Sequence, residues 1–80
     1  MRTVTLLGRP GCHLCDDARA GLELLRRDHP FALEERDIES DPELLRAHLE
    51  RIPVILVDSE EVSHLFLDPS ALLRALDRVP

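Results

Sequence analysis

The spacing of apolar residues changes along the chain, and each change marks the boundary of a predicted element. The segment from Thr3 to Leu7 is nearly continuous in apolarity, which is typical of a strand buried on both faces. From His13 to about Asp28, apolar residues at spacings of four, four and three predict one stripe of a helix. The stripe consists of Leu14, Ala18, Leu22 and Leu25. We expect this helix to stop at His29, because the proline that follows disfavours helical geometry in the residue before it.

The middle of the chain predicts a weaker strand and a short helix. The segment from Phe31 to Ile38 alternates only imperfectly between apolar and polar residues. Its two expected faces carry Phe31 with Leu33, and Ala32 with Ile38. Asp41 and Pro42 form a helix start, because aspartate is a favoured N-cap and proline fits the first helical position. The helix is expected to end near Glu50, with a buried side formed by Leu44, Leu45, His48 and Leu49.

The last third of the chain predicts two strands and a final helix. Val54 to Val57 is a second fully apolar run, and Asp58 to Glu60 is a tight polar connection to Val62 to Phe66. Two strands joined by so short a loop must be antiparallel. Asp68 and Pro69 repeat the aspartate-proline helix start. The apolar side of the final helix is formed by Leu72, Leu73, Leu76 and Val79.

The predicted element order is therefore β-α-β-α-β-β-α, an α/β arrangement. A strand, helix and strand in succession imply a parallel pair with a right-handed crossover, and the closing hairpin adds antiparallel strands to the same sheet. We expect a four-stranded mixed sheet flanked by helices on both faces. The chain has 80 residues, so residues 1–80 are interpreted as a single domain.

Charge and hydropathy restrict the possible partners. The formal net charge is −6, all ten basic residues are arginine, and no block of like charge could follow a phosphate backbone, so nucleic acid is not expected. No apolar stretch approaches the roughly 20 residues of a membrane span, and the amino terminus does not resemble a signal peptide. We therefore expect a cytoplasmic monomer, with a mature secreted form as the alternative.

The chemistry-bearing residues are the only two cysteines, Cys12 and Cys15, which follow Gly8 to Gly11 where the first strand turns into the first helix. A helix that begins at Cys12 or His13 places the first sulfur at the positive end of the helix dipole, which favours a thiolate. Cys12 is then the more exposed sulfur and the better nucleophile. Cys15 lies one turn into the helix, close enough to resolve a mixed disulfide by attacking the sulfur of Cys12.

Charged neighbours of Cys12 act in opposite directions. Arg9 and a protonated His13 would stabilise the thiolate, whereas Asp16 and Asp17 in the first helical turn would oppose it. The sequence therefore predicts a modestly activated Cys12 and a reducing couple.

Two less reactive interpretations of the cysteines stay open. One is a structurally quiet pair with incidental spacing. The other is a zinc site, which needs four ligands, whereas the four histidines and the carboxylates show no ligand spacing relative to the cysteines. We expect no metal and no cofactor.

The element order, the CxxC at the first strand–helix junction, and Ile52-Pro53 before the third strand together resemble the thioredoxin fold in its minimal glutaredoxin-like form. The resemblance covers essentially the whole chain. The pattern Arg-Pro-Gly-Cys-x-x-Cys is most similar to that of small bacterial glutaredoxin-like proteins. This resemblance implies a cis peptide bond before Pro53 that faces the cysteines, and a backbone at Ile52 that binds substrate.

The resemblance also identifies candidate site residues. Cys12 and Cys15 are the catalytic pair. The candidate substrate-binding residues are Arg9, Pro10, His13, Ile52 and Pro53. Glutathione is a doubtful substrate, because the chain has no tyrosine and has Ser63 to Leu67 where glutathione-using relatives carry a glycine pair.

Three functions follow from these observations. The first is a thiol-disulfide oxidoreductase that reduces a protein disulfide or the disulfide of a low-molecular-weight thiol. The second is a non-enzymatic module that uses the two cysteines to bind a metal or an iron-sulfur cluster. The third is an inactive scaffold that binds partners through a hydrophobic groove.

Overall fold

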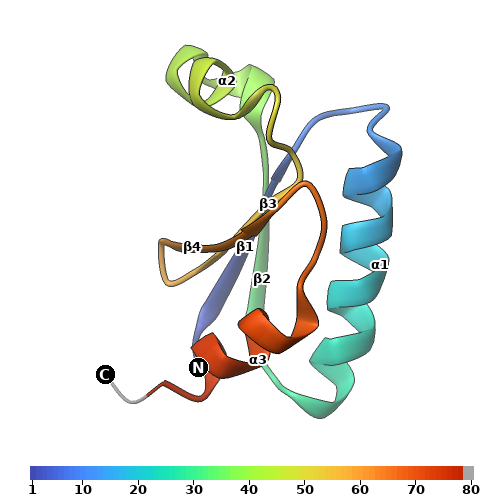
Figure 1. Cartoon of the computed structure of the whole chain (residues 1–80), viewed down its shortest axis with the longest axis vertical. Coiled ribbons are helices and arrows are strands. Elements are labelled where there is room, and N and C mark those ends of the chain that lie inside the picture. The colour runs from blue at the N-terminus through green and yellow to red at the C-terminus, as the bar shows by residue number, and fades with distance from the viewer. Residues whose placement is uncertain (79–80) are drawn as a thin grey trace.

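Four strands form one mixed sheet in the order β2-β1-β3-β4. In the computed structural model, which describes residues 1–78, the elements are β1 (Thr3–Gly8), α1 (His13–Asp28), β2 (Ala32–Asp37), the 3-10 turn η1 (Ile38–Ser40), α2 (Pro42–His48), β3 (Val54–Val57), β4 (Glu60–His64) and α3 (Pro69–Leu76) (Figure 1). Strand β1 is parallel to β2 and antiparallel to β3, and β3 is antiparallel to β4. The predicted α/β class and the four-stranded mixed sheet are confirmed.

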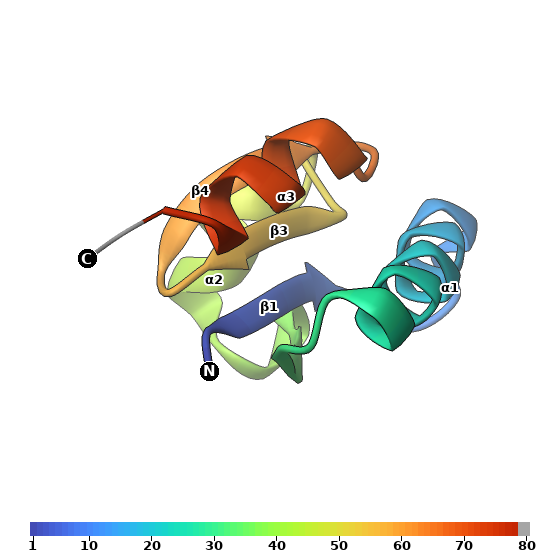
Figure 2. The same ribbon diagram turned by 90° about the horizontal axis from the view of Figure 1, so that it is seen from below.

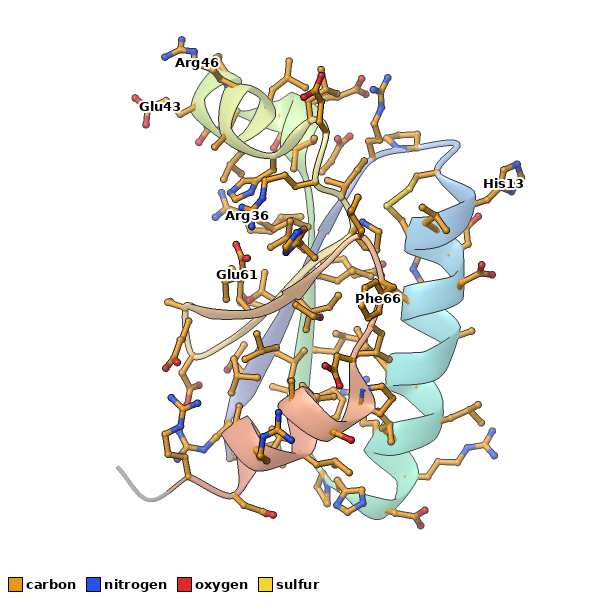
Figure 3. The ribbon with its side chains drawn as sticks, viewed as in Figure 1. His13, Arg36, Glu43, Arg46, Glu61 and Phe66 are labelled. Carbon is orange, nitrogen blue, oxygen red and sulfur yellow. A yellow bond between two sulfur atoms is a disulfide. The ribbon has the colours of Figure 1, made fainter. Side chains whose placement is uncertain are left out.

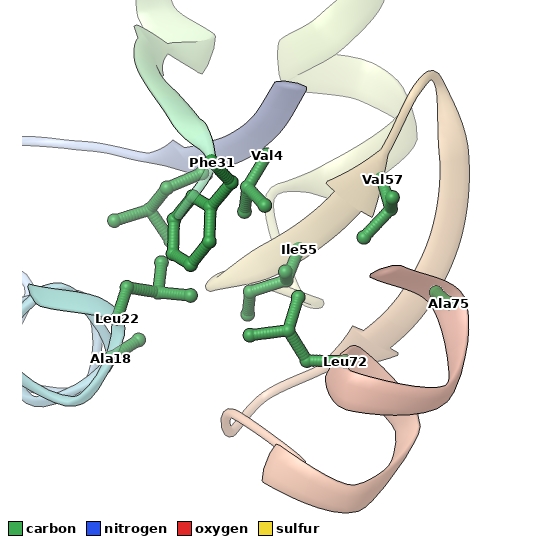
Figure 4. Packing of buried hydrophobic residues seen from close by; sticks show 9 residues of the cluster. Val4, Ala18, Leu22, Phe31, Ile55, Val57, Leu72 and Ala75 are labelled. Carbon is green, nitrogen blue, oxygen red and sulfur yellow. The ribbon is translucent and has the colours of Figure 1, made fainter. Parts of the chain in front are cut away.

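The sheet is covered differently on its two faces. Helices α1 and α3 pack on one face (Figure 2), over the main cluster of buried residues: Val4, Leu6, Ala18, Leu22, Phe31, Ile55, Val57, Leu72 and Ala75 (Figure 4). A second group of buried residues, the site cluster, consists of Leu7, Cys15, Ile38, Ile52 and Val54, with Leu44 and Leu45 of α2 packed against it. Neighbouring strand residues point to opposite faces, so Leu6 and Leu7 belong to different clusters.

The second strand is shorter than predicted. Phe31 is buried just before β2, and Ile38 lies in η1 rather than at the end of a strand. The reason is local: the Asp37 carboxylate accepts a hydrogen bond from the Glu39 N–H at 2.8 Å, and the Ser40 hydroxyl donates to the Asp37 carbonyl at 2.6 Å. Such side-chain bonds compete with the strand ladder. Strand β2 is also an edge strand, which explains its charged residues and weak alternation.

Helix α2 is also shorter than predicted, although its start is confirmed. The Asp41 carboxylate accepts a hydrogen bond from the Glu43 N–H at 2.9 Å, as expected of an N-cap. The helix ends at His48 rather than near Glu50, and Leu49 is exposed instead of buried. Because α2 covers only one end of the sheet, its half-buried side is limited to Leu44, Leu45 and His48.

The β3–β4 hairpin is antiparallel as predicted, but its turn is tighter. Only Asp58 and Ser59 form the turn, both at positive φ (48° and 75°), as a two-residue turn with strand-matched twist requires. Strand β4 therefore begins at Glu60 and ends at His64, so the predicted strand from Val62 to Phe66 was placed too late.

The final helix is confirmed over the part of the chain that the structure describes. Asp68 accepts a hydrogen bond from the Ala71 N–H at 3.1 Å, and Leu72 is fully buried. Leu73 and Leu76 are half-buried, and Val79 lies outside the described residues. Among residues 1–78, none of the helices is long and apolar enough to cross a membrane.

Candidate functional site

A tight turn carries the chain from β1 into α1. Arg9 follows the strand, and Pro10 and Gly11 form the turn. Proline suits the second position of such a turn, and Gly11 has φ 77°, which glycine adopts without steric cost. Cys12 follows this turn as the N-cap residue of α1, in agreement with a predicted helix start at Cys12 or His13.

The two cysteines form a disulfide with a Cα–Cα distance of 5.2 Å. The Cys15 N–H donates a hydrogen bond to the Cys12 Sγ at 3.1 Å. Cys12 is half-buried, whereas Cys15 is 1 % exposed. Because α1 begins at His13, Cys12 lies at the positive end of the helix dipole. The predicted asymmetry is confirmed: Cys12 is the accessible sulfur and Cys15 lies one turn inside.

Gly8 is a site residue that the sequence reasoning missed. A Cβ atom at this position would lie 2.9 Å from the Cys15 Sγ and 3.2 Å from the Cys15 Cβ. The close approach of the strand end to the buried sulfur therefore needs a residue without a side chain. The only sequence signal for this role is a glycine at the end of the first apolar run, four residues before Cys12.

The segment before β3 contacts the same cluster as the cysteines. The Ile52–Pro53 peptide bond is cis, as the resemblance implied, and both side chains are buried. Ile52 belongs to the site cluster with Cys15, and Cys12 packs against that cluster. The structure therefore brings the disulfide together with Ile52 and Pro53.

Hydrogen bonds from the loop that follows β4 fix the backbone carbonyls of the two residues next to Ile52. The Leu65 N–H donates to the Arg51 carbonyl at 2.9 Å and to the Pro53 carbonyl at 2.8 Å. Arg51 is fixed in addition by a hydrogen bond to Glu61, which lowers the pKa of the Glu61 carboxyl. Both interactions hold the segment that faces the cysteines.

The other predicted binding residues lie away from Ile52 and Pro53. The Arg9 guanidinium is 3.1 Å from the Glu39 carboxylate of η1. Arg9 and Pro10 line a surface pocket of about 330 Å³ between α1 and the end of β2. Since β2 and β3 flank β1 on opposite sides, this pocket and the Ile52 segment are on different sides of the motif. Figure 3 shows that His13 points outward from α1, away from the disulfide.

An ion-pair network compensates part of the acidic charge next to the motif. Arg19 donates hydrogen bonds to Glu35 and, at 2.7 Å, to Asp16. The bond to Glu35 and then the bond to Asp16 raise the pKa of Arg19. Arg19 thus partly neutralises the charge of Asp16, which is expected to oppose a thiolate at Cys12.

Among residues 1–78, no group of three or more histidine, cysteine, aspartate or glutamate side chains is arranged to hold a metal ion. The site consists of a disulfide beside the buried backbone segment at Ile52 and Pro53.

Solved structures of other proteins share this fold. The solution structure of protein Ne2328 from Nitrosomonas europaea is 33% identical to this chain, with a TM-score of 0.83 over 91% of this chain and 88% of that chain. A mutant thioredoxin from Halobacterium salinarum has a TM-score of 0.67 at 19% identity, over 99% of this chain and 78% of that chain. Thioredoxin 1 from Thermosipho africanus has a TM-score of 0.62 at 14% identity, over 95% of this chain and 91% of that chain.

The two thioredoxins share the fold with this chain, at identities too low to show more. No curated protein matches the sequence. The family model described as Glutaredoxin-like domain (DUF836) matches residues 3–77, which is nearly the whole chain. The chain therefore belongs to this glutaredoxin-like family, and it shares the fold of the thioredoxins.

Proposed function

We propose that the protein is a thiol-disulfide oxidoreductase that uses both cysteines. The observation that carries the proposal is the unequal burial of the pair: an accessible Cys12 at the helix N-cap and a buried Cys15 directly behind it. A nucleophile needs access to its substrate, whereas a resolving cysteine needs access only to the first sulfur. Both requirements are met here beside Ile52 and Pro53.

The reaction begins from the reduced protein. The Cys12 thiolate attacks one sulfur of a substrate disulfide, the substrate S–S bond breaks, and its other sulfur leaves as a thiolate that takes a proton from water. Cys15 then loses its proton and attacks the Cys12 Sγ. This step forms the Cys12–Cys15 bond and releases the second substrate thiolate, so two electrons pass from the protein to the substrate. An external dithiol returns the protein to its reduced form.

Two features of the site support the first step. The helix dipole and the Cys15 N–H, which donates to the Cys12 sulfur at 3.1 Å, both favour negative charge on that sulfur. The Arg51 and Pro53 carbonyls, which accept hydrogen bonds from the Leu65 N–H, hold the backbone at Ile52, and this order supports the proposal that an extended substrate binds there. The proposed substrate is a protein disulfide or the disulfide of a low-molecular-weight thiol in the cytoplasm.

The proposal is tested with single cysteine variants and dithiothreitol as the reductant. Cys12→Ser should abolish reduction of a protein disulfide and of 2-hydroxyethyl disulfide. Cys15→Ser should retain the attacking thiolate and accumulate a mixed disulfide that intact-mass spectrometry detects. The same variant, exposed to cell extract, should hold substrate proteins through Cys12.

The exposed residue Leu24 on the far part of α1 supplies a matched control, and Leu24→Gln should leave both rates unchanged. Full activity in Cys12→Ser would refute the assignment of the nucleophile. A stoichiometric metal, or the visible absorption of an iron-sulfur cluster, in the purified protein would instead support a binding module.

A further inference from the structure

Leu65 adopts a backbone conformation that its side chain disfavours. Its φ is 69°, in the left-handed region, where the Cβ of a leucine crowds the following carbonyl and glycine would not. The side chain is also 43% exposed, which is unfavourable for a large apolar group. Because both features are energetically unfavourable, Leu65 is a candidate for a functional role if it is connected to the candidate site.

Backbone hydrogen bonds connect Leu65 to the candidate site. Its N–H is shared between the Arg51 and Pro53 carbonyls, at 2.9 Å and 2.8 Å, and the residue between them is Ile52. Ile52 in turn belongs to the site cluster with Cys15. The left-handed conformation therefore fixes Leu65 directly beside the segment that faces the disulfide.

Two other exposed apolar side chains flank the same place. Phe66, the next residue, is 64% exposed on the loop that faces α1 (Figure 3). The loop touches α1 at Gly21, because a Cβ there would lie 2.8 Å from the Leu67 Cδ2. Leu14 is 53% exposed and precedes Gly21 by seven residues, or two helical turns, so it lies on the same helix face. We call these three exposed apolar residues, from the first turn of α1 and from the loop that follows β4, the apolar rim: Leu14, Leu65 and Phe66.

We propose that Leu65 is a specificity-determining residue for the exchange reaction, and this inference rests on the proposed function. With Phe66, it contacts an apolar side chain next to the reacting cysteine of an extended protein segment. A small, polar disulfide has no apolar group to bury on the rim and gains nothing from it. The preferred substrate is therefore a protein disulfide with apolar neighbours.

The test compares two disulfide-linked peptides that are identical except for leucine or serine after the cysteine, together with 2-hydroxyethyl disulfide. Leu65→Asn and Leu65→Gly both tolerate the left-handed backbone and remove the apolar side chain. Leu24→Gln is the control, because Leu24 is an exposed leucine of α1, about 13 Å along the helix from Cys15.

For the unmodified protein, we expect kcat/KM to be about fivefold higher for the leucine peptide than for the serine peptide. Partial burial of one apolar side chain is expected to give a preference of this size. Both Leu65 variants should lower this ratio toward one and should slow the reduction of the leucine peptide more than that of 2-hydroxyethyl disulfide, whereas Leu24→Gln should keep the ratio. An unchanged ratio in the Leu65 variants, or an equal loss of rate on all three substrates, would overturn the inference. Unmodified protein that reduces none of the three would overturn the proposed function and this inference with it.

Discussion

Gly8→Ala tests whether the buried sulfur of Cys15 is packed directly against the end of β1. The new Cβ would lie 2.9 Å from the Sγ and 3.2 Å from the Cβ of Cys15, so these contacts must lengthen by about 0.5 Å and 0.2 Å to reach 3.4 Å, where ordinary van der Waals contact begins. Gly8 is not at positive φ, so alanine can adopt its backbone and the effect is purely steric. Overpacking of this kind costs about 1–3 kcal/mol.

The cost should depend on the redox state. In the oxidised protein the sulfur is bonded to Cys12 and enclosed by the site cluster, so it cannot move away. In the reduced protein the Cys15 Sγ can rotate away from the new methyl group. Only the contact with the Cys15 Cβ then still has to lengthen, by about 0.2 Å. Urea unfolding with and without reductant should show the larger loss for the oxidised form, and a difference of about 1.4 kcal/mol would raise the reduction potential by roughly 30 mV. Oxidised Gly8→Ala that unfolds at the same urea concentration as the unmodified protein would refute the reasoning.

Gly21→Ala is a matched control, because its new Cβ would meet an even closer atom. That atom, the Leu67 Cδ2 at 2.8 Å, is the end of a flexible side chain that can rotate. Alanine also gains about 0.5–1 kcal/mol over glycine in the interior of a helix. We expect a small change in stability that is equal in both redox states. A loss as large as that of Gly8→Ala would show that rotation of the contacted side chain does not relieve the overpacking.

Three further predictions concern stability, each measured by urea unfolding. Asp68→Ala should lose about 1 kcal/mol, because the Ala71 N–H loses its cap, and Asp68→Ser should restore most of it. The backbone hydrogen bond from Thr3, followed by the bond from Arg2, lowers the pKa of Asp58 below its ordinary value. The resulting stabilisation is complete above about pH 4 and is lost as the pH falls through the folded-state pKa, so the gap between the unmodified protein and Asp58→Asn should shrink from pH 5 to pH 2. Leu22→Ala should lose about 2–5 kcal/mol, because the side chain is fully buried in the main cluster, and a loss below 1 kcal/mol would contradict that placement.

The sequence predicted the elements whose signals are local. Strand β1 and helix α1 follow from a continuous apolar run and a helical stripe, and both agree with the structure to within a residue. Helices α2 and α3 begin where Asp41 and Asp68 act as N-caps, because the capping hydrogen bond joins residues two or three apart. The position of Cys12 at the start of α1 follows from the same kind of short-range signal.

The errors occur where contacts distant in sequence, or competing side-chain bonds, decide the structure. Leu49 has the spacing of a buried helix residue, but α2 covers too little of the sheet to bury it. The roles of Gly8 and Leu65 depend on contacts with Cys15 and with the segment around Ile52, respectively, which no local pattern encodes. The ion pair between Arg9 and Glu39 depends on a 3-10 turn that the sequence did not predict, and the substrate-binding role of Arg9 stays a prediction.

The membership of Cys15 in the site cluster determines the order of the proposed exchange. Leu7, Ile38, Ile52 and Val54 come from different parts of the chain and enclose the Cys15 side chain, which is 1% exposed. A substrate disulfide in solution cannot reach a sulfur in that position, so the first attack has to come from Cys12. Cys15 can react only with a sulfur that is already bonded within its reach, and the Cys12 Sγ of the mixed disulfide meets this condition. In the proposed exchange, apolar packing at the end of the sheet therefore assigns the role of nucleophile to Cys12 and that of resolving residue to Cys15, independently of any difference in their charge.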